Sequence, residues 1–409
     1  MRKGVALLVA LLALAGCTAN GPLAPKPSAV ARVSPSPSPS PTPTPAESPS
    51  PSPSPTAEPS PVEVPAWAAL HATCSGTPAA EEAILQLQGA ANPVLADVTD
   101  PRTPRTLCGI SGPAPLQIQP QLVTQTMISW NATQGAPGKN GTSVVAILDL
   151  FSGVSAVAAT WSGGGFLDGL HAWSPDRGFL AYVASDSKGV YLHVLSGGGD
   201  RVIATLGAVP GRGFNPNEDD AYLAFSPDGA YLALEQTFTS SGDQLQVRRT
   251  IDGSLAFSLA RATMATWGST GSRLYFRPPG SGLVQVWDSA KGVSQAFGQQ
   301  LTWIRPRSAV GTDTTLAFAV RDSAGTPHTW LYSHDGRSGG QLPNVRSMPA
   351  WMTATAFFYV EEAACGANCG IGPAWQPDGK TFTFDTSTQT ETPSRIQAVY
   401  GSWPRPGQT

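Results

Sequence analysis

The sequence has little charge. Only 13% of its 409 residues are Asp, Glu, Lys or Arg, and its formal net charge is −3. It shows no basic stripe, so we expect no nucleic-acid partner. Beyond the N-terminus it has no apolar run of bilayer-spanning length. It also has no long stretch of helical periodicity except Pro78–Gly89. A helical fold, a polytopic membrane protein and a nucleic-acid-binding protein are therefore not expected.

The N-terminus has the layout of an export signal. Arg2 and Lys3 precede the apolar run Gly4–Leu14, which as a helix would cover roughly 16 Å, about half of a bilayer core. The next residues, Leu-Ala-Gly-Cys ending at Cys17, resemble the lipobox of bacterial lipoproteins. The resemblance implies cleavage of residues 1–16 and lipid attachment to Cys17. The alternative is an ordinary signal peptide that ends near a cysteine.

A proline-rich segment follows the first mature residues. In Ser34–Pro61 nearly every second residue is proline, which favours an extended polyproline II chain. At ~3.1 Å per residue it would reach on the order of 90 Å. We therefore predict a lipidated tether at 17–33, an extended stalk at 34–63 and a folded domain at 64–409.

Four cysteines remain after Cys17, an even number that favours disulfides in an exported chain. The preferred pairs are Cys74–Cys108 and Cys365–Cys369, although a cross-paired arrangement stays open. The spacing of Cys365 and Cys369 also resembles a metal-ligand pair, but a second pair and nearby histidines are missing.

The folded domain contains a repeat. The clearest copies, each with an aromatic residue before a turn and an apolar strand after it, are His171–Val183, Leu223–Leu234, Met264–Phe276 and Gly372–Phe384. Proline, Asp and Gly in the Ser-Pro-Asp-Gly turn favour a tight reversal between two strands. This pattern resembles the TolB-type, WD-like repeat of β-propellers, which implies an all-β fold built from four-stranded blades.

Aromatic residues mark the blades at roughly 40–50-residue intervals. The markers are Trp130, Trp173, Phe225, Trp267, Trp303 and Trp351. Trp375 follows Trp351 too closely and is placed inside the same blade, after an insertion. A seventh blade is expected from Pro93–Cys108, with Arg395–Trp403 as its inner strand, so that the N- and C-terminal segments pair and close the ring. Seven blades are predicted, with six and eight as alternatives.

No motif gives a catalytic, cofactor or metal site. The G-x-S-x-G pattern at Gly336–Gly340 is interpreted as a hairpin turn, because the remaining chain is too short for a hydrolase domain. Glu218–Asp220 lacks the alternating spacing of calcium loops. The histidines have no metal-ligand spacing and are expected to be structural: His71, His171, His193, His328 and His334.

Four tryptophans lie outside the repeat markers: Trp161, Trp287, Trp330 and Trp403. Clustered at the mouth of the channel, they could stack on sugars, but packing between outer strands is the favoured interpretation.

These features predict an extracytoplasmic, lipid-anchored, monomeric propeller. The resemblance implies protein contacts, so we expect a non-enzymatic module that binds or scaffolds an envelope protein. The alternatives are a glycan or small-solute binder and a propeller-based envelope enzyme of the lyase or hydrolase type.

Overall fold

The computed structural model describes sixteen stretches of the chain. They are residues 62–76, 85–88, 93–113, 120–135, 141–162, 166–207, 222–236, 244–271, 273–281, 283–295, 302–303, 307–308, 315–322, 324–333, 338–364 and 375–396. Within these stretches all regular structure is β-strand, and no helix is long and apolar enough to cross a membrane.

The strands form seven sheets, numbered here as blades 1 to 7 along the chain. Blade 1 contains β1 (His71–Cys74), β2 (Leu85–Gln88), β3 (Val94–Asp97) and β4 (Arg105–Ser111). Blade 2 contains β5 (Gln121–Leu122), β6 (Met127–Gln134), β7 (Thr142–Asp149) and β8 (Ser155–Ser162). Blade 3 contains β9 (Phe166–Trp173), β10 (Phe179–Ser185), β11 (Val190–Ser196) and β12 (Gly199–Gly207). Blade 4 contains β13 (Tyr222–Phe225), β14 (Tyr231–Gln236), β15 (Gln244–Arg249) and β16 (Leu255–Ala260).

The remaining three blades follow the same plan. Blade 5 contains β17 (Thr263–Trp267), β18 (Arg273–Arg277), β19 (Gln285–Asp288) and β20 (Gly292–Gln295). Blade 6 contains β21 (Thr302–Trp303), β22 (Arg307–Ser308), β23 (Thr315–Arg321), β24 (Pro327–Ser333) and β25 (Ser338–Gln341). Blade 7 contains β26 (Arg346–Trp351), β27 (Ala356–Ala364), β28 (Trp375–Asp385) and β29 (Thr390–Ser394).

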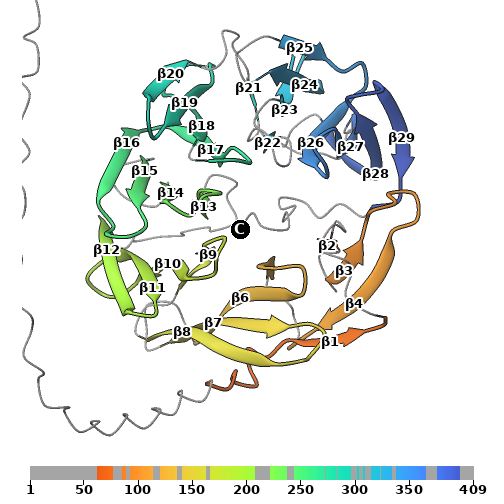
Figure 1. Ribbon diagram of the computed structural model, residues 1–409. Helices are drawn as coiled ribbons and strands as arrows, with labels where there is room; N and C mark the ends of the chain where they lie inside the picture. Colours follow the sequence, from red (N-terminus) through yellow and green to blue (C-terminus); the bar gives the residue numbers. More distant parts are fainter. Residues whose placement is uncertain are drawn as a thin grey trace, which may run out of the picture. The chain divides into compact units, whose positions relative to one another are not determined.

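The blades stand around a common centre, each with its first strand inside and its last outside, except blade 1 (Figure 1). In blade 6 two short strands, β21 and β22, both pair with β23 and together occupy the inner position. The fold is therefore a seven-bladed β-propeller, as the repeat predicted.

Side chains rather than shared strands join the blades. No strand of one sheet pairs with a strand of another within the described chain. Instead, each of seven buried apolar clusters takes residues from two neighbouring blades. Side chains alternate between the two faces of a strand, so each sheet packs against both of its neighbours.

The Ser-Pro-Asp turns are held by their own side chains. In blade 3, Asp176 accepts hydrogen bonds from Ser174 Oγ at 2.6 Å and from the Gly178 amide at 3.0 Å. Blade 4 repeats the pattern with Asp228. The left-handed position carries Gly229 (φ 71°) in blade 4 but Arg177 (φ 62°) in blade 3, so this position tolerates a residue other than glycine.

Ring closure differs from the expectation. Blade 1 takes all four strands from the N-terminal part, in the order β1-β4-β3-β2, with β2 inside. The prediction that Arg395–Trp403 supplies the inner strand is therefore wrong for the described residues Arg395 and Ile396. They contact blade 1 differently: the Arg395 amide donates to Pro101 O at 2.9 Å, and Ile396 packs with Val98.

Two other expectations need correction. The helical periodicity of Pro78–Gly89 does not produce a helix at Leu85–Gln88, which pairs with β3 as a strand. The aromatic markers do not all occupy the same strand of a blade. Trp130 lies in the second strand of its blade, whereas Trp173 and Trp267 end inner strands. Trp375 begins β28 in the same blade as Trp351, as predicted.

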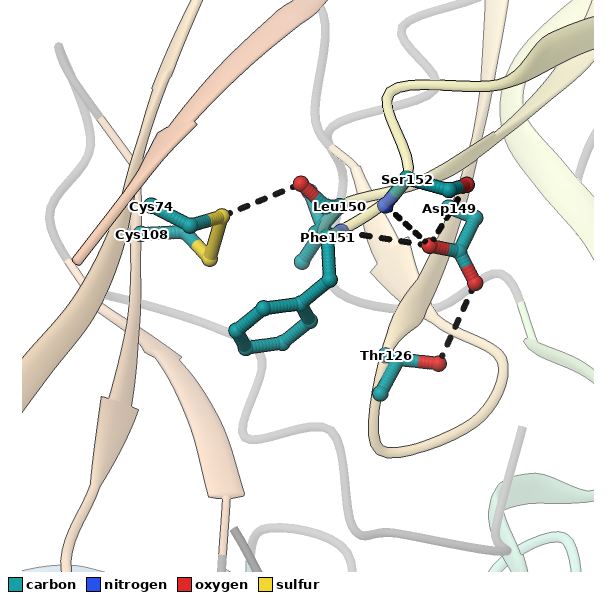
Figure 2. The surroundings of a disulfide bond; sticks show 7 residues. All are labelled: Cys74, Cys108, Thr126, Asp149, Leu150, Phe151 and Ser152. Carbon is teal, nitrogen blue, oxygen red and sulfur yellow. Dashed lines mark hydrogen bonds between the residues drawn. A yellow bond between two sulfur atoms is a disulfide. The ribbon is translucent and has the colours of Figure 1, made fainter. Parts of the chain in front are cut away.

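A disulfide fixes the outermost strand of blade 1. Cys74 of β1 and Cys108 of β4 are register partners joined by a disulfide, the pairing that the sequence favoured. The Cys74 sulfur lies 3.0 Å from the carbonyl oxygen of Leu150 in blade 2 (Figure 2). The turn that presents Leu150 is held by Asp149, which accepts from the Phe151 and Ser152 amides. Cys17, Cys365 and Cys369 lie outside the described residues.

The disulfide should contribute measurably to stability, because it closes a loop with a sequence separation of 34 residues. Replacing Cys74 and Cys108 together by Ala should lower the free energy of unfolding by about 2–4 kcal/mol. Urea denaturation of the purified domain measures the change. An unchanged midpoint with an unchanged slope would contradict this role.

Candidate functional site

Ser129 and His171 form the described pair that most resembles a nucleophile and its base. Ser129 Oγ lies 2.8 Å from His171 Nε2, and Trp173 Nε1 donates to the same Oγ at 3.0 Å. Trp173 can only donate. In one tautomer the Ser129 hydroxyl donates to His171 Nε2, and the imidazole proton is on Nδ1. Nδ1 is then the one polar atom of this pair without a hydrogen-bond partner. The other tautomer would leave two groups unpaired.

Burial makes this pair structural rather than catalytic. Ser129 is fully buried and His171 is 2% exposed, so no substrate reaches them. Burial lowers the pKa of His171 to about 4, which keeps the ring neutral near pH 7. The pair joins β6 of blade 2 to β9 of blade 3, so it stabilises one junction of the ring.

A second histidine is enclosed in blade 3. His193 Nδ1 lies 3.0 Å from Asp200 Oδ2, which also accepts from the Tyr182 hydroxyl at 2.8 Å. The imidazole stacks on the Tyr182 ring and meets the Trp161 ring edge-on. Burial and the bond to Asp200 raise the pKa of Tyr182, so the phenol stays protonated. This cluster packs blade 3 against β8 of blade 2.

The unassigned tryptophans are mostly built into the blades. Trp161 Nε1 donates to Ser185 O at 2.9 Å, and Trp287 is buried against the ring of Tyr231. Trp330 stacks on Tyr332. These three do not form an exposed row of rings for a sugar, and Trp403 lies outside the described residues.

A buried carboxylate links blades 4 and 5. Glu235 of β14 is fully buried and accepts from the amides of Met264 at 3.0 Å and Ala265 at 2.7 Å. Met264 has a positive φ of 62°, a conformation that strains a residue with a side chain. Glu235 therefore fixes the irregular start of β17, the inner strand of blade 5.

An open pocket with an apolar lining lies between the turns of blades 3 and 4. Its volume is about 270 Å³. It is lined by Phe179, Gly229, Ala230, Tyr231, Arg249, Thr250 and Ile251. The guanidinium of Arg249 lies 6.0 Å from the centre of the Tyr231 ring. Aromatic walls with a positive charge at one side suit an apolar or aromatic group beside an acceptor.

Ile251 is the exposed large apolar residue among those that line this pocket. It sits at the tip of the β15–β16 turn and is 73% exposed. Its carbonyl accepts from Arg201 Nη2 of blade 3 at 3.2 Å. Gly253, with φ 74°, packs so closely on Ile203 that a Cβ there would lie 2.7 Å from it. The turn is thus held on blade 3 while the Ile251 side chain points to solvent.

Sequence reasoning missed this pocket. Phe179 and Tyr231 were assigned to hairpins only, and Ile251 lies outside the aligned repeat. A signal was present: Ile251 directly precedes Asp252-Gly253, a turn position where a polar residue is expected.

The remaining candidates add no site. Ser338 and Gly340 of the G-x-S-x-G pattern belong to β25 and pair with β24, as expected for a hairpin. No group of three or more His, Cys, Asp or Glu placed to hold a metal occurs among the described residues. Glu218–Asp220 and His334 lie outside them.

Solved structures with a similar fold were found, at low identity. TolB from Acinetobacter baumannii is 15% identical, with 78% of this chain and 81% of that chain covered, at a TM-score of 0.38. Prolyl oligopeptidase B from Galerina marginata is 14% identical, with 80% and 51% covered, at a TM-score of 0.52. An oligogalacturonate lyase in complex with manganese is 9% identical, with 78% and 87% covered, at a TM-score of 0.46.

The chain shares the β-propeller fold with these proteins. This likeness is one of fold, and the chain spans about half the length of the prolyl oligopeptidase B. No protein-family model matches the sequence, and no curated protein matches it either.

The buried His171 predicts a pH dependence of stability. In the unfolded chain His171 is protonated below its ordinary pKa of 6.5. In the folded domain the same ring stays neutral down to about pH 4. Stability from this residue is therefore complete above pH 6.5 and falls as the pH drops, by about 2 kcal/mol between pH 7 and pH 5. Urea denaturation at both pH values should show a smaller loss for His171→Asn than for the wild type. His71→Asn, at an exposed position, is the matched control, and equal losses in all three would contradict the assignment.

Glu235 should contribute more to the free energy of unfolding than a carboxylate on the surface does. Glu235→Ala removes the acceptor of two amides of β17, those of the half-buried Met264 and the buried Ala265, and each loss costs about 1–3 kcal/mol. We expect the free energy of unfolding to fall by roughly 3 kcal/mol or more in urea denaturation. Glu235→Gln keeps one carbonyl acceptor and should lose less. A Glu235→Ala domain as stable as the wild type would show that the two bonds are dispensable.

Proposed function

We propose that this protein is a lipid-anchored envelope lipoprotein whose propeller docks a partner protein. The lipobox-like residues ending at Cys17 and the proline-rich segment 34–63 support an anchor and a stalk. In this proposal they hold the propeller outside the cytoplasm at a distance from the membrane. The docking role is carried by one structural observation, the pocket between blades 3 and 4 with Ile251 exposed at its rim.

The composition of the pocket favours a protein group as its occupant. Phe179, Tyr231 and Ile251 offer apolar contact, and hot spots of protein interfaces are aromatic or apolar anchors in such pockets. Arg249 and Arg201 add donors beside them. Asp252 Oδ1 accepts from the Ser254 amide and hydroxyl, which fixes this carboxylate within the turn.

The rigidity of the turn also supports docking. Arg248 Nη1 donates to Ile203 O at 3.2 Å and to Gly253 O at 2.9 Å, which ties the base of the turn to the neighbouring blade. A side chain presented on a fixed backbone loses little conformational freedom on binding.

The proposal is tested by a crosslinking pull-down from intact cells with full-length protein tagged at its C-terminus. Ile251→Asp should reduce recovery of the partner roughly tenfold, because a carboxylate would be buried in an apolar contact. Val154→Asp is the matched control: Val154 is 62% exposed and ends the equivalent turn of blade 2. Cys17→Ala controls for localisation.

Recovery of one or a few envelope proteins with the wild type and Val154→Asp, but not with Ile251→Asp, would support the proposal. Recovery of nothing above background from cells that contain abundant folded protein would contradict it.

A further inference from the structure

The outer strands of the blades differ in how their free edges are protected. An exposed edge strand carries unpaired backbone groups, and proteins protect such edges with charge, proline, shortness or a covering segment. β12 carries Asp200 and Arg201, and β29 carries Glu391 and Pro393. In the part of the chain that the structure describes, the outer strands of blades 1, 5 and 6 have four residues each.

The outer strand of blade 2 is partly covered by the chain itself. β8 has eight residues and no charge, but the segment before β1 contacts its outer edge, where the Val157 amide donates to Val62 O at 2.9 Å. The same segment buries Val64 and Ala68 in the core shared by blades 1 and 2. A backbone hydrogen bond from another segment therefore occupies part of this uncharged edge.

Among the described outer strands with more than four residues, β16 differs from the others because it has none of these protections. Its six residues, Leu-Ala-Phe-Ser-Leu-Ala, include no charge and no proline. The inner edge of β16 is hydrogen-bonded to β15 along its whole length, from Gln244↔Ala260 to Arg248↔Leu255. The outer edge faces away from β15.

The side chains of β16 leave that edge accessible. Phe257 is anchored inward, with its ring 5.5 Å from that of Phe276. The alternate side chains, Ala256, Ser258 and Ala260, are small and exposed. At the end nearest the pocket, Leu255 is 52% exposed and follows the Ile251 turn by four residues.

We propose that the outer edge of β16 binds an extended strand of the partner protein by β-strand addition, beside the Ile251 pocket. This inference rests on the proposed docking function and specifies the form of the partner. Only an extended segment offers amides and carbonyls at the spacing of a strand edge. We expect the added strand to be uncharged as well, because β16 offers no charged side chain to pair with a charged residue of that strand.

A second copy of this chain is not the favoured occupant. Two rigid propellers meeting rim to rim would touch along a single six-residue strand. Stable dimers bury about 1,200–2,000 Å², which such a contact does not reach. An extended segment of another protein can follow β16 and also enter the neighbouring pocket.

The test adds a charge to the edge within the same intact-cell pull-down. Ser258→Lys should reduce recovery of the partner roughly tenfold, since a lysine on the edge opposes strand addition. Ser294→Lys, at an exposed position of β20, should leave recovery unchanged. Thermal denaturation of both variants confirms that each is folded.

Hydrogen exchange then locates the contact. The protein recovered with the wild type is purified and mixed with the propeller, and the β16 amides should exchange at least tenfold more slowly than in the free propeller. Loss of recovery with Ser258→Lys together with this protection supports strand addition.

Four results would overturn the inference. Equal recovery with Ser258→Lys and the wild type, or unchanged exchange in β16, would reject strand addition while leaving docking through the Ile251 pocket intact. Recovery of a second copy of this chain as the bound protein would identify a different occupant. Recovery of nothing with the wild type would reject both the docking function and this inference.

Discussion

The packing of each blade against its two neighbours is the constraint on which the rest of this structure depends. Seven separate sheets share no strand, so the ring is held by side chains at seven junctions. Every sheet must therefore be apolar on both faces, which explains why second strands such as β10 and β14 are almost entirely buried. The polar residues between blades are hydrogen-bonded within these junctions, as Glu235 and the Ser129–His171 pair show.

The junction that closes the ring is built differently from a shared strand. Ala96 and Val98 of blade 1 pack with Phe358 and Ile396 of the C-terminal part, and the Arg395 amide bonds to Pro101 O. At the other side of blade 1, the segment before β1 and the Cys74–Cys108 disulfide fix its outermost strand. The N-terminal residues thus complete blade 1 alone, and the C-terminal residues only contact it.

Local signals in the sequence predicted the repeating part of the fold. The Ser-Pro-Asp turns at Ser174 and Ser226 and aromatic residues such as Trp173 and Trp267 indicated the repeated blades, because turn chemistry and strand alternation act over a few residues. The seventh blade was predicted from Pro93–Cys108. Ring closure was mispredicted, because the choice between Leu85–Gln88 and the C-terminal segment as the inner strand depends on contacts distant in sequence. The pocket was missed for the same reason: Phe179 and Ile251 come from different blades, and an apolar residue in the Ile251 turn does not by itself indicate which side chains lie beside it.

A structure of the propeller with its recovered partner would show whether the partner docks on the β15–β16 hairpin of blade 4, as we propose. We expect an extended partner segment paired with β16 and an apolar side chain of that segment between Phe179, Tyr231 and Ile251. A partner bound at the mouth of the central channel, with β16 and the pocket free, would rule out this docking surface.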